Sequence, residues 1–148
     1  MIQKSDFELR NFLPYLLNQA ADASSLEFQR YYKSRYGMLR TEWRVIFHLG
    51  RYGTMTAKQI CDAAGLHKTK VSRAVAALEE KRFLKREVLS TDRRHEALTL
   101  TRPGMRVFDD LSAAAQKFDS TLQAAFTPTE RDVLQRCLRQ IAGMTDPS

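Results

Sequence analysis

Two short amphipathic segments joined by a single glycine turn constrain the fold of this chain more than any other feature. Residues 56–59 (TAKQ) form a capping box, a threonine followed three positions later by glutamine, which predicts a helix that ends at Gly65. A second helix is predicted from Lys68 to about Lys81, so that only residues 65–67 separate the two. Two short helices with a glycine-containing turn between them are typical of a helix-turn-helix.

The second of these helices has two contrasting faces when its residues are placed 100° apart. Its apolar side is expected to be buried, and it consists of Val71, Ala74, Val75 and Leu78. The opposite side carries hydroxyl and basic groups in its N-terminal half and acids at its C-terminal end: Thr69, Arg73, Ala76 and Glu80, with Lys70 and Ser72 on the flanks. This polarity suits a helix whose N-terminal residues enter the major groove of DNA, where Arg73 could fork onto a guanine edge. A solvated basic surface helix is the alternative.

A basic hairpin is predicted directly after this helix. Residues 83–89 and 96–100 have the composition of strands, and the turn-forming residues 90–94 (STDRR) connect them. Arg93 and Arg94 at the expected tip are spaced to reach a minor groove beside the major groove that the helix would occupy. Narrow minor grooves concentrate negative potential and attract arginine.

Further helices are expected before the helix-turn-helix. Apolar residues recur at helical spacing over residues 9–20, where Pro14 predicts a kink or an early turn, and again at positions 28, 32 and 36. Gly37 then suits a helix stop. Thr41 is expected to cap the next helix, and Gly50 to lie just past its end.

Two more helices are expected at the C-terminal end. Thr101 can cap a long helix from Arg102, and a capping box at residues 127–130 (TPTE) predicts a last one with Leu134, Cys137, Leu138 and Ile141 as its apolar stripe. The long helix has apolar residues spaced 3, 4, 3, 4, 3, which is a heptad seam: Phe108, Leu111, Ala115, Phe118, Leu122 and Ala125. Such a seam packs against a second copy or against the chain's own core.

The charge is concentrated where the groove-reading elements are predicted. The 148 residues carry a net charge of +7, and residues 56–102 hold eleven lysines and arginines against six acids, a net +5. A polyanionic partner is therefore expected to meet the protein there. No apolar run approaches the roughly 20 residues that span a bilayer, and the N-terminal residues do not resemble a signal peptide, so we expect one cytoplasmic domain with no membrane partner. Cys61 and Cys137 are then expected to be reduced thiols.

Catalysis is not indicated by the sequence. The three histidines, His48, His67 and His95, fall in separate predicted elements, and neither a Cys-x-x-Cys pair nor a glycine-rich phosphate loop is present. We therefore expect neither an enzyme nor a metal or other cofactor.

In these segments the chain resembles the MarR family of winged helix-turn-helix regulators. The resemblance is carried, in one register, by residues 39–45 (LRTEWRV), 55–61 (MTAKQIC), 71–73 (VSR) with 78–79 (LE), 92–94 (DRR), and 98–101 (LTLT) with Gly104. It implies one domain over residues 1–148, mainly α with a small β-hairpin wing. The DNA-binding lobe would occupy about residues 39–101, and dimerisation helices about residues 7–37 and 102–144.

The resemblance further implies a triangular homodimer, built from the first, fifth and sixth helices, that regulates transcription at inverted-repeat operators. Arg94 would be the minor-groove arginine and Asp92 its brace. Two departures are His67, where the family often has a better helix cap, and the lack of a proline before Asp92. The expected DNA-binding residues are Thr56, Lys58, His67, Lys68, Thr69, Lys70, Ser72, Arg73, Arg86, Asp92, Arg93 and Arg94.

The sequence leaves the regulatory signal open. A repressor released by a small aromatic or phenolic ligand is the first hypothesis, with a cleft lined by Tyr15, Trp43, Arg44, His48 and Phe108, although such apolar residues also suit a plain core. A thiol-based redox sensor is an alternative, but Cys61 and Cys137 lie on apolar helix faces and are expected to be buried and inert. A winged-helix module that binds protein or RNA instead of duplex DNA is a further alternative.

Overall fold

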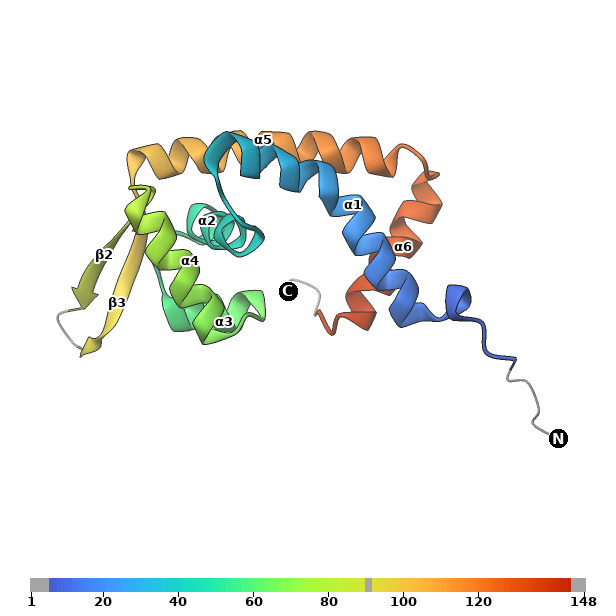
Figure 1. Ribbon diagram of the computed structural model, residues 1–148, viewed down its shortest axis with the longest axis horizontal. Helices are drawn as coiled ribbons and strands as arrows, with labels where there is room; N and C mark the ends of the chain where they lie inside the picture. Colours follow the sequence, from blue (N-terminus) through green and yellow to red (C-terminus); the bar gives the residue numbers. More distant parts are fainter. Residues whose placement is uncertain (1–5, 90–91, 145–148) are drawn as a thin grey trace. The chain divides into compact units, whose positions relative to one another are not determined.

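The computed structural model describes residues 6–89 and 92–144, and most of them are helical (Figure 1). Within these ranges, six α-helices and a small antiparallel sheet form two compact units, one up to Ala114 and the other from Ala115 on. The predicted class, mainly α with a small β-hairpin wing, is confirmed. None of the described helices combines the length and the apolar character that a membrane span requires.

Helix α1 (Leu13–Tyr36) follows a short 3₁₀ turn, η1 (Leu9–Asn11). Pro14 lies in the first turn of α1, where its missing N–H costs no intrahelical hydrogen bond, so the early turn is confirmed. The helix ends as predicted at Gly37, which adopts the left-handed conformation at φ 63° and donates its N–H to the carbonyl of Lys33.

Helix α2 (Arg40–Tyr52) differs from the prediction at both ends. Thr41 is not the cap but lies within the first turn, and the carboxylate of Glu42 instead accepts a backbone N–H at the helix start, at 2.9 Å. Gly50 does not end the helix. The ring of Phe108 lies over it, and a Cβ at this position would be 2.3 Å from ring atoms. Gly50 therefore permits close packing of a neighbouring side chain.

The helix-turn-helix and its hairpin follow α2. Their elements are β1 (Met55–Thr56), α3 (Ala57–Ala64), α4 (Lys68–Glu80), β2 (Leu84–Leu89) and β3 (Asp92–Leu100). The strand order is β1-β3-β2, with both pairs antiparallel. The predicted capping box is confirmed, because the Thr56 hydroxyl accepts the Gln59 N–H at 3.2 Å and the Gln59 amide oxygen accepts the Thr56 N–H at 2.9 Å. The two-residue strand β1 was not predicted.

The hairpin has a shorter connection than predicted. Strand β3 begins at Asp92 and not at Glu96, and Leu89 pairs with Asp92 across a register shift that follows Val88. Three residues of β3, at positions 93–95, lie between Asp92 and Glu96, the partners of the adjacent residues Leu89 and Val88, so this irregularity is wider than a one-residue bulge. Arg93 therefore belongs to the strand, as does Arg94, and only residues 90–91, outside the described ranges, connect the two strands.

The core of the first unit is built around α2. Its largest completely buried side chains come from the α1–α2 turn and from α2, α3, α4, β3 and α5: Met38, Val45, Ile46, Ile60, Val71, Val75, Leu78, Leu98 and Leu111. The predicted buried stripe of α4 is thus confirmed in full, since Ala74 is also buried. This packing fixes which side of α4 faces solvent.

Helix α5 (Arg102–Gln123) begins as predicted after Thr101, whose hydroxyl accepts the Gly104 N–H at 3.1 Å and donates to the carbonyl of Arg82 at 2.7 Å. Thr101 thereby joins the start of α5 to the turn that follows α4. The predicted heptad seam is shorter than expected, because Ala125 lies beyond the end of the helix.

The second unit contains the end of α5 and helix α6 (Pro128–Ile141). The predicted capping box of α6 is confirmed by reciprocal hydrogen bonds between Thr127 and Glu130, at 2.9 and 3.2 Å. Its apolar stripe is exposed in the single chain, because so small a unit has little apolar surface of its own to cover it: Val133, Leu134, Leu138 and Ile141.

Candidate nucleic-acid interface

Helix α4 presents its polar side to solvent in the predicted orientation. Val71 and Leu78 are completely buried, while every polar residue of the N-terminal half is exposed: Lys68, Thr69, Lys70, Ser72 and Arg73. His67 occupies the N-cap position, and its side chain makes no capping hydrogen bond. The first N–H groups of α4 are therefore not satisfied by this side chain, and a helix N-terminus of this kind favours an anion.

A cavity of about 490 Å³ lies between α3, α4 and the hairpin. Its floor is apolar and includes Val75 and Leu98. Five of the predicted DNA-binding residues line it: Thr56, Lys58, Lys68, Ser72 and Arg86. The structure thus brings together residues from the starts of both helices and from the wing, although Arg86 is 18 positions from Lys68.

Arg86 is held by two carboxylates, which the sequence reasoning did not foresee. Its Nε lies 3.3 Å from Glu79 Oε2 at the end of α4, and its Nη1 lies 3.3 Å from Glu96 Oε2 on β3. Its prediction as a DNA contact took account of its charge alone. The partners come from elements that only the tertiary fold brings to β2.

The remaining wing residues are placed by their backbone. Asp92, Arg93 and Arg94 form the start of β3, just after the connection, and the surroundings of their side chains lie outside what the structure describes. The backbone therefore keeps both arginines at the outer end of the hairpin but not in the turn itself.

The predicted ligand-cleft residues are only partly brought together. Trp43 packs against Phe28 and Phe47, and Phe47 also contacts Phe108, with ring centroids 5.1 to 5.9 Å apart. These four side chains form an aromatic row across α1, α2 and α5. Tyr15 lies thirteen residues before Phe28 on the same helix, about 20 Å along the helix axis at 1.5 Å per residue, so it does not join the row.

Arg44 and His48, which were predicted to line the ligand cleft, both have side-chain contacts with the backbone. The Arg44 guanidinium donates to the carbonyl of Ala64 at 2.7 Å, and burial lowers the pKa of this side chain. His48 Nδ1 lies 2.7 Å from the carbonyl of Arg44. The first contact ties α2 to the end of α3, so Arg44 supports the helix-turn-helix.

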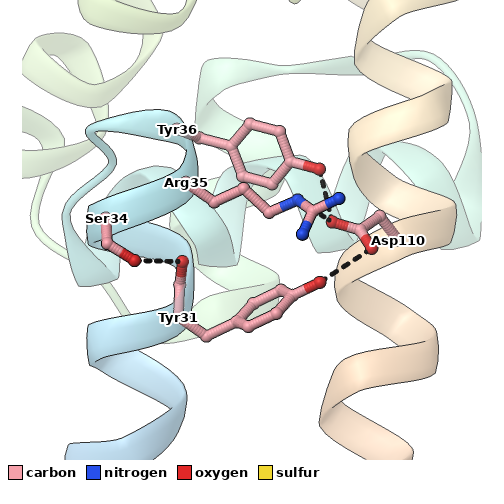
Figure 2. A network of polar contacts seen from close by, with 5 residues as sticks. All are labelled: Tyr31, Ser34, Arg35, Tyr36 and Asp110. Carbon is pink, nitrogen blue, oxygen red and sulfur yellow. Dashed lines mark hydrogen bonds and ion pairs between the residues drawn. The ribbon is translucent and has the colours of Figure 1, made fainter.

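A polar cluster between α1 and α5 was not predicted (Figure 2). The hydroxyl of Tyr31 donates to Asp110 Oδ1 at 2.9 Å, the hydroxyl of Tyr36 donates to Oδ2, and Arg35 Nε lies 3.3 Å from the same Oδ2. Burial alone would raise the pKa of Asp110, but the hydrogen bonds from the two tyrosines and the nearby Arg35 hold that pKa below its usual value. The sequence separation of more than 70 residues left no local pattern that could reveal this cluster.

The cysteines are less buried than predicted. Cys61 is half-buried and lines the cavity, and Cys137 is exposed. Cys137 belongs to the apolar stripe of α6 and was expected to be buried with it, but in the single chain that side of the helix faces solvent.

The fold and this face define a winged helix-turn-helix protein. Residues 36–95 match the model of the MarR family. YwaE of Bacillus subtilis, an uncharacterized HTH-type transcriptional regulator, is 25% identical over 109 residues, which are 74% of this chain and 64% of YwaE. The chain thus matches less than two thirds of that relative's length.

Solved structures agree with this match. A MarR/EmrR family transcriptional regulator from Acinetobacter sp. ADP1 is 28% identical, with a TM-score of 0.81 over 93% of this chain and 96% of that one. MepR of S. aureus, in complex with DNA, has a TM-score of 0.82 at 16% identity over 89% of this chain and 96% of MepR, a likeness of fold. Over residues 36–95 the chain is therefore similar to the MarR family.

Proposed function

We propose that this protein is a sequence-specific transcription regulator that binds duplex DNA as a homodimer through α4 and the wing. The observation that carries the proposal is the exposed N-terminal half of α4, where Thr69, Lys70 and Arg73 project from a helix whose opposite face is buried. A helix anchored in this way can enter a major groove with its polar side chains leading.

The proposed contacts divide by chemistry. Arg73 reads a guanine edge with its two-pronged guanidinium, and Thr69 and Lys70 contact bases or backbone. The residues near the starts of α3 and α4 bind phosphates: Thr56, Lys58, His67, Lys68 and Ser72. At the wing, Arg94 enters the minor groove with Asp92 as its brace, and Arg93 adds charge.

The proposed homodimer accounts for apolar surface that the single chain leaves exposed. Large apolar side chains are exposed at the start of α1 and just before it, and again on α6: Phe7, Leu9, Phe12, Leu13, Leu16, Val133, Leu134, Leu138 and Ile141. Exposed apolar sets of this size mark interaction surfaces. We propose that a second copy covers them, which gives the two recognition helices that an inverted repeat requires.

We further propose that the protein is a repressor that a small aromatic ligand releases from DNA, acting in the cytoplasm. The aromatic row of Phe28, Trp43, Phe47 and Phe108 supports this, because flat rings stack favourably on such side chains. Arg44 is not part of this proposal, since its guanidinium already donates to the backbone carbonyl of Ala64 at the end of α3.

Selection of duplexes from a random pool tests the proposal. We expect the purified protein to enrich an inverted repeat with half-site centres about one helical turn apart, and to bind it more tightly than a scrambled duplex at 150 mM salt. Enrichment of no common sequence, together with equal affinity for both duplexes, would refute sequence-specific regulation.

A further inference from the structure

We infer that Arg86 is a positioning residue that holds the wing against the C-terminal end of the recognition helix, and not a DNA ligand. The inference rests on the proposed function of α4 and the wing. It concerns three side chains, Glu79, Arg86 and Glu96, on α4, β2 and β3 respectively.

The register of the hairpin places Arg86 and Glu96 on the same face. Arg86 lies opposite Leu98, and Glu96 is two residues from Leu98 along β3, so the two side chains are diagonal neighbours. Glu79 reaches the same guanidinium from the last turn of α4, through Arg86 Nε. One planar group therefore joins both strands of the wing to the helix that would read the major groove.

This junction lies where the hairpin leaves the three-stranded sheet. Strand β1 pairs with β3 only at Leu98 and Ala97, so Glu96 is the next residue toward the tip. Beyond it, β3 pairs with β2 alone in the described part of the chain, and Val88 opposite Glu96 is 60% exposed. The wing therefore stops packing against the rest of the sheet near Glu96, which is one of the two residues that Arg86 contacts.

The cavity explains why the wing needs polar contacts with α4 to hold its position. Arg86 and Glu96 line the cavity between the wing and α3, so open space, and not packed side chains, separates this stretch of the wing from Lys58. With no packing there, the direction of the outer hairpin depends on the polar contacts at its base. Lys85, the neighbouring cation, pairs with Glu87 within β2 and cannot fix the wing to another element.

The chemistry of the cluster argues against a direct contact of Arg86 with phosphate. A guanidinium is a planar fork that can engage two carboxylates at once, and here Nε lies beside Glu79 while Nη1 lies beside Glu96. The side chains are 35% to 47% exposed, so each pair adds little to global stability. We therefore expect the two ion pairs to affect the position of the wing relative to α4, and through it the affinity for DNA, more than the stability of the fold. A phosphate at the remaining N–H groups of Arg86 would lie beside two carboxylates, whose negative charge repels it.

The double variant Glu79→Gln, Glu96→Gln distinguishes the two roles, because they predict opposite signs. It removes two negative charges per subunit near DNA, which by charge alone strengthens binding. A positioning role predicts weaker operator binding, by about threefold to tenfold, the scale of lost exposed ion-pair networks. Arg86→Gln should weaken binding at least as much, because it also removes a positive charge, and combining all three substitutions should cost less than the sum of the two separate losses.

Arg86→Lys keeps the charge but lacks the planar fork, so positioning predicts a loss like that of the Glu79→Gln, Glu96→Gln variant, whereas a phosphate contact predicts near-normal binding. The control is Lys85→Gln, Glu87→Gln, which removes the neighbouring ion pair and should leave affinity within about twofold. Melting temperatures confirm that each variant is folded. Unchanged or tighter operator binding by the Glu79→Gln, Glu96→Gln variant overturns the inference. If the wild-type protein bound no duplex, the proposed function itself would fail.

Discussion

Single residues on α4 and on the wing should contribute to binding in different ways. Arg73 is exposed on the side of α4 that is proposed to enter the major groove, so Arg73→Ala should lose base discrimination as well as affinity. A bidentate contact with a base is worth about 1–3 kcal/mol per half-site, and a symmetric dimer makes it twice. The measurement is a binding titration on operator and scrambled duplexes at several salt concentrations.

The matched comparison is Arg94→Ala. This residue lies at the outer end of β3 and is proposed to act through charge and groove width, so its loss should weaken both duplexes more nearly alike. The salt dependence should also flatten by about one unit of slope per subunit. Equal behaviour of the two variants on both duplexes would contradict the division of roles.

Asp110 makes stability depend on pH. Its pKa in the folded protein lies below its usual value of 3.8, so its stabilising contacts are present above that value and are lost as pH falls through the folded-state pKa. Asp110→Asn should lower the free energy of unfolding by about 1–3 kcal/mol at pH 7, because Tyr31 and Tyr36 lose a charged acceptor. The difference between wild type and variant should shrink below about pH 4.

Urea unfolding of both proteins from pH 7 to pH 3 measures this difference. Asp109→Asn is the control, since Asp109 is the exposed neighbouring acid on the same helix. The direction in which stability changes at alkaline pH follows from the two tyrosines. Hydrogen bonding to Asp110 raises the pKa of Tyr31, and burial together with such a bond raises that of Tyr36, so stability should fall as pH rises above 10. A constant difference between wild type and Asp110→Asn across the acid range would contradict the assignment.

At the scale of elements, the sequence predicts best what local chemistry determines. The capping boxes at Thr56 and Thr127 and the left-handed Gly37 and Gly65 ended or began helices where predicted, because each acts within one turn. The outward face of α4 followed from its buried stripe. Strand β1 could not be found in this way, since two residues become a strand only by pairing with a distant partner.

The errors share that cause. Gly50 was interpreted as a helix stop because the ring of Phe108, 58 residues away, is invisible to a local pattern. The two carboxylate partners of Arg86 could not be predicted for the same reason, because they are on other elements. The exposure of Cys137 likewise depends on what covers α6, which a single helix pattern does not specify.

The packing of α2 against α5 gives a prediction at this scale. Gly50→Ala should destabilise the protein by about 1–3 kcal/mol, although alanine is the better helix former, because its Cβ would lie 2.3 Å from the Phe108 ring. Thermal unfolding measures the loss. The double variant Gly50→Ala, Phe108→Leu should lose less than the two single changes combined, since the smaller side chain leaves room for the methyl group. An alanine variant as stable as wild type would mean that the ring has space to move.

The whole molecule should be a dimer, because the apolar stripe of α6 is otherwise left in water. Val133, Leu134, Leu138 and Ile141 are each 41% to 56% exposed in the single chain, while the capping box at Thr127 fixes the helix that carries them. Light scattering at micromolar concentration should give twice the chain mass of 17.1 kDa.

The variant Leu138→Glu should shift the measured mass toward that of the monomer, since a charge cannot be buried unpaired at an interface. The control Arg136→Glu changes charge on the same helix at a residue outside the apolar stripe, and it should leave the dimer intact. Operator affinity should fall with the dimer in Leu138→Glu and persist in the control, because a single recognition helix reads only one half-site. A wild-type protein of monomer mass that still bound its operator tightly would show that the exposed stripe serves some other partner.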